Sequence, residues 1–226
     1  MDAVDSDFFT AYADVHVHQI MLKDQARNEA YWAALQALAK GKIVLDVGSG
    51  TGFLSILAAR AGAAHVYAVE ASDMAEVSKH IVEDNMLSDN ITIIKGRVED
   101  VTLPCMVDII VSEWMGFYLV HESMMRSVLV ARDRFLKPGG CVIPESADIF
   151  CAPANCDSDV QSSISWCKNH VACHRNTFVV IVVVHRVARC GVRAAVKRSL
   201  PISSPFQLPY FAGGTRDCTL AKVFLP

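Results

Sequence analysis

A glycine-rich segment of the chain has the residue types and spacing of a nucleoside-binding loop. Residues 46–52, DVGSGTG, follow a short β-branched run, and their three alternate glycines let a backbone turn sharply and approach a ligand closely. The dinucleotide pattern G-x-G-x-x-G fails because its third glycine would fall on Phe53. We therefore expect Asp46, Gly48 and Gly50 to bind a nucleoside with a compact amino-acid end.

Two acidic residues lie at or just after the ends of later predicted strands. Glu70 lies 18 residues after Gly52, where a carboxylate accepts hydrogen bonds from both hydroxyls of a ribose. Glu99 follows the next predicted strand and could accept a hydrogen bond from an adenine amino group. For the glycine loop and Glu70, the competing interpretation is a plain turn with a surface glutamate. For Glu99, it is a solvated acidic turn.

Strands and helices alternate along the first two thirds of the chain. The patterns predict strands over 42–47, 65–70, 91–95 and 107–112 and from 141 onward, and helices over 31–38, 53–61, 74–85 and 123–135. Gly62 is expected to end the second helix, and residues 137–140 are expected to end the last. This alternation predicts an α/β fold with a doubly wound, mainly parallel sheet.

Charge divides the chain near residues 154–163. Residues 161–226 contain nine basic residues and one acidic residue, whereas residues 1–160 have a net charge of −11. No apolar run approaches the ~20 residues of a membrane helix, and the acidic start, MDAVDSDFF, lacks the pattern of a secretory signal. We expect no membrane association and an intracellular protein, cytoplasmic or nuclear, whose eight cysteines are free thiols.

These segments together resemble the protein arginine methyltransferases. The stretches similar to successive motifs of that family are FFTAYADVHVHQIMLKDQAR (8–27), IVLDVGSGTG (43–52), AVEAS (68–72), ITIIKGRVEDV (91–101) and DIIVSEWMGFYLVHESM (108–124). The resemblance covers about residues 8–153 and is most specific from Glu113 to Glu122. The wording GFYLVHESM is closest to an asymmetric-dimethylating branch.

The resemblance implies an S-adenosylmethionine-dependent, Rossmann-like methyltransferase that modifies arginine residues of proteins. It implies that Glu113 and Glu122 bind the acceptor guanidinium, that Glu70 and Glu99 bind the nucleoside, and that Arg27 binds the donor's carboxylate. Asp24 would orient Arg27 or take part in proton removal. The pocket would be lined by His18, Met21 and Met124.

The chemistry of the guanidinium group supports two of these assignments. A guanidinium is a permanent cation with five N–H donors, and each of two carboxylates can accept a pair of them. The carboxylates would draw positive charge toward the nitrogens they touch, which leaves more lone-pair density on the remaining nitrogen. Positioning should supply much of the rate of such an in-line displacement.

The chain also departs from the family pattern. Phe8 stands where the N-terminal motif usually has Tyr, although Tyr12 remains, and the family's Thr-His-Trp triplet is missing from the sequence. We expect three parts: an N-terminal helical segment (1–40) that closes over the cofactor, a Rossmann-like domain (41–153) and a basic region (154–226) that forms a partial or divergent barrel.

Three functions remain open. The chain is expected to methylate Arg-Gly-rich protein segments, with histones or RNA-binding proteins as substrates. Alternatively, it is a catalytically impaired paralogue that regulates a full-length enzyme, as a homo- or hetero-oligomer, or it methylates a small molecule. The double-glutamate loop argues against the last, because a neutral acceptor does not need two carboxylates.

The C-terminal region offers two weaker hypotheses. A zinc site could be formed by Cys167, His170, Cys173 and His174, but C-x2-H-x2-C-H is not a known finger spacing, and no metal is expected. Basic residues between 186 and 198 recur at roughly helical spacing. A solvated face explains them better than nucleic-acid binding does.

Overall fold

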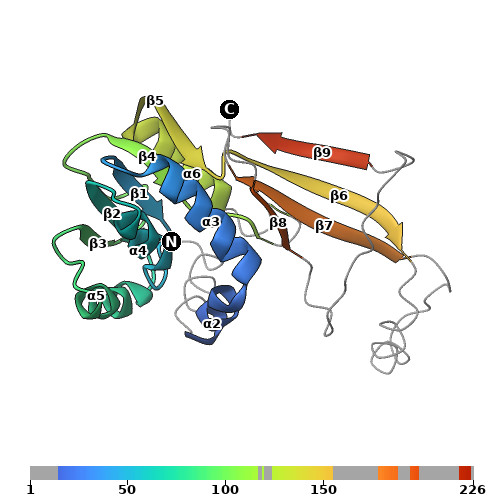
Figure 1. Cartoon of the computed structure of the whole chain (residues 1–226). Coiled ribbons are helices and arrows are strands. Elements are labelled where there is room, and N and C mark those ends of the chain that lie inside the picture. Colours follow the sequence, from blue (N-terminus) through green and yellow to red (C-terminus); the bar gives the residue numbers. More distant parts are fainter. Residues whose placement is uncertain are drawn as a thin grey trace.

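The structure is a computed structural model, and it describes residues 15–116, 119, 124–154, 178–187, 194–198 and 219–224 (Figure 1). Phe8, Tyr12, Glu122 and the cysteine and histidine cluster at 167–174 lie outside the described residues. The predictions that rest on them therefore stay predictions.

A five-stranded parallel sheet forms the centre of the methyltransferase-like region. Its strands are β1 (Ile43–Val47), β2 (His65–Glu70), β3 (Ile91–Lys95), β4 (Val107–Val111) and β5 (Leu136–Ile143). They lie in the order β3-β2-β1-β4-β5, and every pairing is parallel. The order changes direction between β1 and β4, which confirms the expected doubly wound arrangement.

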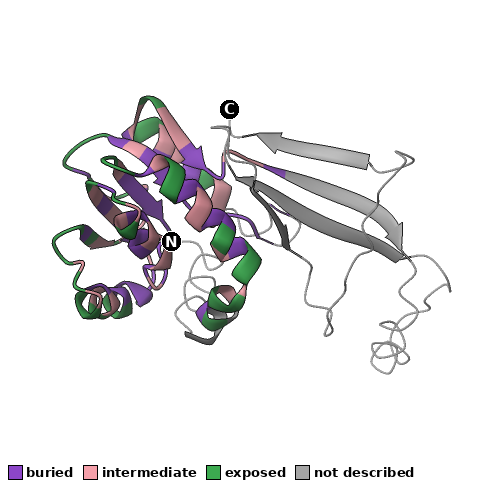
Figure 2. Ribbon diagram, in the orientation of Figure 1, coloured by how far each residue is buried: buried purple, intermediate pink, exposed green. Residues whose placement is uncertain are grey.

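The described residues form five helices beside this sheet. They are α2 (Val15–Lys23), α3 (Gln25–Leu38), α4 (Phe53–Arg60), α5 (Met74–Asp84) and α6 (Met124–Phe135). Contacts join α4 and α5 to β2 and β3, and α6 to β4 and β5. The helices expose residues on their outer sides and bury residues toward the strands (Figure 2). Val44, Leu45 and Ile110 are fully buried, as continuous apolar runs in a covered parallel sheet should be.

Most predicted boundaries agree with the structure to within one or two residues. The larger difference is α3, which was predicted over 31–38 and begins at Gln25. Its first turn has a single apolar residue, Ala26, which is exposed, so hydrophobic periodicity gave no signal there. Asp24 caps this turn by accepting a hydrogen bond from the backbone N–H of Arg27 at 3.2 Å.

The connection from α6 to β5 also differs from the prediction. Residues 137–140 were expected to form a turn before a strand from 141, whereas β5 begins at Leu136, directly after α6. Leu136 pairs with Val107, and the register then shifts between Val107 and Ile109. The shift absorbs Gly139, whose φ of 77° suits glycine, within the strand.

A second, antiparallel sheet follows. Its strands are β6 (Ser146–Ala154), β7 (Phe178–Val187), β8 (Ala194–Arg198) and β9 (Thr219–Phe224), in the order β8-β7-β6-β9. The parallel sheet ends at Ile143, so the change of sheet comes earlier than the domain limit at 153 suggested. Arg186 lies on β7 and Lys197 on β8, so these two basic residues lie on strands and do not share the face of a helix.

No helix within the described ranges is long and apolar enough to cross a membrane.

The packing of Gly140 generates a testable prediction. A Cβ atom at this position would lie 2.8 Å from the backbone oxygen of Asp108 and 2.6 Å from a methyl group of Leu136. Because a strand carbonyl cannot move away cheaply, Gly140→Ala should lower the free energy of unfolding by about 1–3 kcal/mol in urea titrations. Gly139→Asn is the matched control, since no atom lies within 4 Å of the place that a Cβ at this position would take, and Asn tolerates positive φ. Equal stability of the two variants would contradict the packing.

Candidate active site

Polar side chains from three strands meet at the carboxyl edge of the parallel sheet. Asp46 is the next-to-last residue of β1, Glu70 ends β2, and Glu113 follows β4 by two residues. Ligands of open α/β sheets bind at this edge, where the strand order changes direction. That place lies between β1 and β4 in this fold.

The glycine loop is pinned to the end of β2. The backbone N–H groups of Gly48 and Ser49 donate to the carbonyl of Val69 at 2.9 and 3.1 Å. Gly48 and Gly50 have φ values of 71° and 54°, which favour glycine. A Cβ atom at Gly48 would lie 2.7 Å from Cε of Met124, and one at Gly50 would lie 2.7 Å from Cε1 of His18. The loop therefore packs against two of the predicted pocket residues.

Glu70 fixes the loop from the other side. Its side chain is buried, and its two carboxylate oxygens accept hydrogen bonds from the backbone N–H groups of Gly50 at 2.7 Å and Ser72 at 2.8 Å. A carboxylate has about four lone-pair positions, so these bonds leave capacity for two more donors. That capacity matches the two hydroxyls of a ribose.

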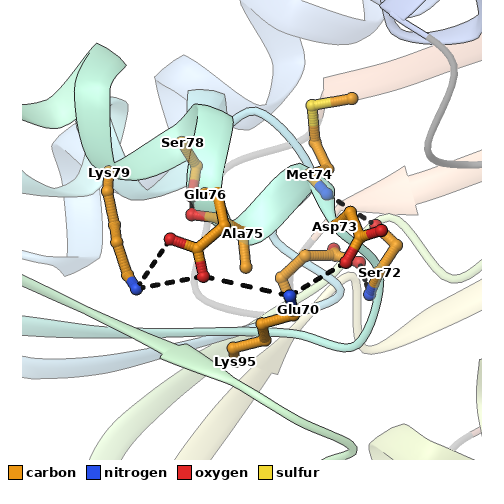
Figure 3. A network of polar contacts seen from close by, with 9 residues as sticks. All are labelled: Glu70, Ser72, Asp73, Met74, Ala75, Glu76, Ser78, Lys79 and Lys95. Carbon is orange, nitrogen blue, oxygen red and sulfur yellow. Dashed lines mark hydrogen bonds and ion pairs between the residues drawn. The ribbon is translucent and has the colours of Figure 1, made fainter.

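The residues that follow Glu70 anchor the start of α5 (Figure 3). The hydroxyl of Ser72 accepts from the backbone N–H of Met74 at 3.2 Å, and Lys95 pairs with Asp73 at 2.8 Å. The Lys95 ammonium lowers the pKa of Asp73. Both groups are exposed, so this pair adds little to stability. The pair connects the start of α5 to the end of β3.

Asp46 is a fully buried acid beside the loop. The hydroxyl of Ser55 donates to its Oδ2 at 2.7 Å, while Oδ1 of Asp46 and Oγ of Ser49 have no hydrogen-bond partner in the described part of the chain. Burial raises the pKa of Asp46 to about 7; the hydrogen bond from Ser55 opposes this rise and the nearby charge of Glu70 adds to it. A cationic ligand group at this place would be stabilising.

Arg27 links the N-terminal helices to the edge of the sheet. Its side chain is 6% exposed, and its Nη1 donates to Oε2 of Glu113 at 3.2 Å. Its Nη2 donates to the carbonyl of Met21, and its Nε lies 3.9 Å from Oδ2 of Asp24. The structure thus joins four of the predicted site residues around one guanidinium.

Backbone and side-chain contacts of Ser112 place Glu113. The Ser112 hydroxyl donates to the carbonyl of Val47 at 2.8 Å, and its N–H donates to that of Ile143 at 3.0 Å. The Tyr31 hydroxyl donates to the Ser112 carbonyl at 3.0 Å. The ends of β1, β4 and β5 and helix α3 are therefore tied together one residue before Glu113.

Glu99 lies on a turn that contacts α6. Its carboxylate accepts a hydrogen bond from the hydroxyl of Ser127 at 2.7 Å and lies 3.6 Å from Nε of Arg97. Three quarters of the Glu99 side chain is shielded from solvent, so a fully solvated acidic turn does not describe it.

Sequence reasoning missed Tyr31, Ser112 and Ser127. The signal for Tyr31 was its spacing, since it lies four residues after Arg27 and so on the same face of a helix. Ser112 and Ser127 gave no such signal, because their partners are distant in sequence. Met21 contributes its backbone carbonyl to Arg27 rather than only a pocket-lining side chain. Among the described residues, no group of three potential metal ligands occurs.

Comparisons with known proteins agree with this geometry. Residues 44–140 match a family model described as a methyltransferase domain. A probable protein arginine N-methyltransferase 6 of Arabidopsis thaliana is 49% identical over 168 residues, which cover 73% of this chain and 39% of the relative. The chain spans less than half the length of the curated relatives it matches.

Solved structures give the same result. The Trypanosoma brucei PRMT1 enzyme-prozyme heterotetrameric complex with AdoHcy is similar with a TM-score of 0.65 at 37% identity, over 78% of this chain and 62% of that chain. A crystal structure of PRMT6-SAH is similar with a TM-score of 0.68 at 26% identity, over 94% of this chain and 88% of that chain.

The raised pKa of Asp46 predicts a pH-dependent stability. The folded protein keeps this proton up to a pH of about 7, whereas the unfolded chain releases it near 3.8. The folded state therefore binds more protons between these values, and the contribution of Asp46 to the free energy of unfolding falls as pH rises. Relative to the wild type, Asp46→Asn should gain on the order of 4 kcal/mol between pH 4 and 8, measured by denaturant titration.

Asp108→Asn provides a control of opposite sign. The backbone N–H of Ile43 and the ammonium of Lys137 lower the pKa of Asp108, so its contribution is present at neutral pH and is lost as the solution is acidified. A stability difference for Asp46→Asn that does not change with pH would show that this carboxyl titrates normally.

Proposed function

Over the matched region the chain belongs to the protein arginine N-methyltransferase family, and on this premise we propose that it transfers a methyl group from S-adenosylmethionine to the guanidinium nitrogen of arginine residues in proteins. The observation that carries this proposal is the contact at Glu113. This carboxylate, at the ligand-binding edge of the sheet, binds the guanidinium of Arg27 at 3.2 Å. The contact supports the proposal, because the same carboxylate could bind the chemical group that an arginine substrate presents.

The residues at the edge of the sheet fit S-adenosylmethionine. The buried oxygens of Asp46 and Ser49 that lack a partner among the described residues would bind the polar amino-acid end, and the remaining lone pairs of Glu70 would bind the ribose. Gly48 and Gly50 carry no side chain of their own, so Met124 and His18 pack directly against the loop and would line the donor's pocket there. Arg27 would hold the carboxylate of the donor, and Glu99 the amino group of its base.

The donor, when bound, supplies an electrophilic methyl group on a sulfonium. Transfer would form a C–N bond as the S–C bond breaks, with the electron pair left on sulfur, and the methylated guanidinium would release one proton. Glu113 neutralises the acceptor cation and orients it, with Glu122 as its proposed second carboxylate. The hydrogen bonds of Ser112 keep Glu113 in place, so little reorganisation accompanies the reaction.

Asp24 has two proposed roles, and its contacts favour one of them. It accepts from the backbone N–H of Arg27 and lies beside the Nε of the same residue. These contacts support an orienting role for Asp24, because both connect it to Arg27. A part in proton removal would require a contact with the acceptor nitrogen.

We further propose Arg-Gly-rich segments of histones or RNA-binding proteins as substrates, in the cytoplasm or nucleus. Glycines beside an arginine remove side-chain bulk, so a long cationic side chain can extend toward Glu113 while the peptide backbone stays near the surface. The substrate class rests on this chemistry.

A regulatory role is the second candidate. One solved relative is described as an enzyme-prozyme heterotetrameric complex, so a related chain occurs in assembly with a partner. In this chain Phe8 replaces the usual Tyr, which removes one hydroxyl from the N-terminal motif. A regulatory partner would bind the donor or a full-length paralogue without turnover of an arginine peptide.

Glu113→Gln tests the guanidinium role. The amide keeps the shape of the side chain but cannot neutralise the acceptor cation, so methyl transfer to an Arg-Gly-rich peptide should fall by roughly 100–1,000-fold. The dissociation constant of S-adenosylhomocysteine, measured by calorimetric titration, should change by less than about 5-fold. Retained transfer in the variant would rule out the proposed role. Donor binding by the wild-type protein without any methyl transfer would favour the regulatory candidate.

Glu70→Gln tests the donor site. The amide retains one acceptor oxygen for the loop, but its N–H₂ group cannot accept from a ribose hydroxyl, so S-adenosylhomocysteine should bind roughly 10–100-fold more weakly. Glu76→Gln is the matched control, because Glu76 lies nearby on the exposed side of α5. Equal affinities for the two variants would exclude the ribose assignment.

A further inference from the structure

The turn that carries Glu99 is held by an arginine of α6. Nη1 of Arg134 donates to the carbonyl of Val98 at 3.0 Å and to that of Glu99, and Nη2 donates to the carbonyl of Val101 at 2.9 Å. Within the turn, the N–H groups of Asp100 and Val101 both donate to the carbonyl of Arg97. Arg134 therefore binds three carbonyls that line one side of the turn.

The geometry of arginine suits this contact. A guanidinium presents donors in a rigid fork, so it binds several carbonyls at once with little loss of side-chain freedom per bond. The guanidinium carbon of Arg134 also lies 4.7 Å from the ring centroid of Phe135. This ring is buried and restricts the guanidinium further.

Ser127 holds the side chain of Glu99 from the same helix. Ser127 lies seven residues before Arg134, which is two turns earlier on the same face of α6. Its hydroxyl donates to Oε1 of Glu99 at 2.7 Å, while Nε of Arg97 lies 3.6 Å from Oε2. One helix thus fixes both the backbone and the carboxylate of Glu99.

We propose that Ser127 and Arg134 are positioning residues that aim the Glu99 carboxylate at the exocyclic amino group of the donor's base. The inference rests on the proposed function, in which Glu99 contacts that base. A carboxylate only accepts hydrogen bonds, so a rigidly held Glu99 favours a 6-amino purine and disfavours a 6-oxo purine. Selectivity for adenine then depends on how firmly the turn is held.

The experiment compares two probes on the purified full chain. Calorimetric titrations with S-adenosylhomocysteine and with its 6-oxo analogue, S-inosylhomocysteine, give two affinities, and their ratio is the base selectivity. The wild type should prefer the amino compound by at least ~100-fold. Ser127→Ala and Arg134→Met should each weaken binding of the amino compound by about 10-fold and lower the selectivity ratio by a similar factor.

Two controls separate positioning from a general loss of structure. Ser127→Thr keeps the hydroxyl and should keep the wild-type selectivity. Arg126→Met removes an exposed arginine of the same helix and should leave both affinities within about 2-fold. A variant that weakens both probes equally has only lost structure, and that result for Ser127→Ala and Arg134→Met would overturn the inference.

The remaining outcomes distinguish the inference from its premise. If the wild type binds neither probe, the proposed function and the inference both fail. If Glu99→Gln loses selectivity while Ser127→Ala and Arg134→Met keep it, Glu99 recognises the base without help from α6, and only the inference fails. Loss of selectivity in all three variants, with Ser127→Thr unaffected, supports both.

Discussion

A concentration of acidic side chains at one edge of the parallel sheet is the constraint on which the rest of the site depends. Parallel strands bring their carboxyl ends to the same edge, and here those ends carry Asp46, Glu70 and Glu113. Each of the three carboxyl groups has a different environment. Burial raises the pKa of Asp46, two backbone N–H groups bind Glu70, and the guanidinium of Arg27 pairs with Glu113. The glycine loop supplies the backbone N–H of Gly50 to Glu70, and the N-terminal helices supply Arg27 to Glu113.

Two helices transmit this constraint across the site. Helix α3 presents Arg27 to Glu113 and, one turn later, Tyr31 to the carbonyl of Ser112. Helix α6 begins with Met124 against Gly48 and ends with Arg134 on the turn of Glu99. Helix α6 therefore contacts loops that follow β1 and β3, whereas both of these contacts of α3 are with the segment that follows β4. A shift of α6 would disturb two parts of the site together, because packed elements move as units.

The sequence predicted most of the parallel sheet well, because the inner strands β1 and β4 are buried on both faces. Continuous β-branched runs then mark them directly, and β2 and β3 have the predicted bounds. The glycine loop was also predictable, since the positive φ values of Gly48 and Gly50 demand glycine. The contacts between side chains of different elements were not predictable from the sequence. Arg27 and Glu113 are 86 residues apart, and Arg134 lies 36 residues from Val98, so only the folded topology brings them together. The polar first turn of α3 and the bulged start of β5 lacked periodicity.

Charge balance connects the donor and acceptor halves of the proposed reaction. In the structure, Arg27 is the guanidinium that compensates Glu113, and it lies in a buried place where an unpaired charge is costly. On the proposed function, the carboxylate of the donor would give Arg27 a second anionic partner, and the ammonium of the donor would compensate Asp46. Glu113 would then share Arg27 with the donor and gain attraction for another guanidinium. On this proposal, the carboxylates at this edge would offset the positive charges of the donor's sulfonium and ammonium and of the acceptor guanidinium.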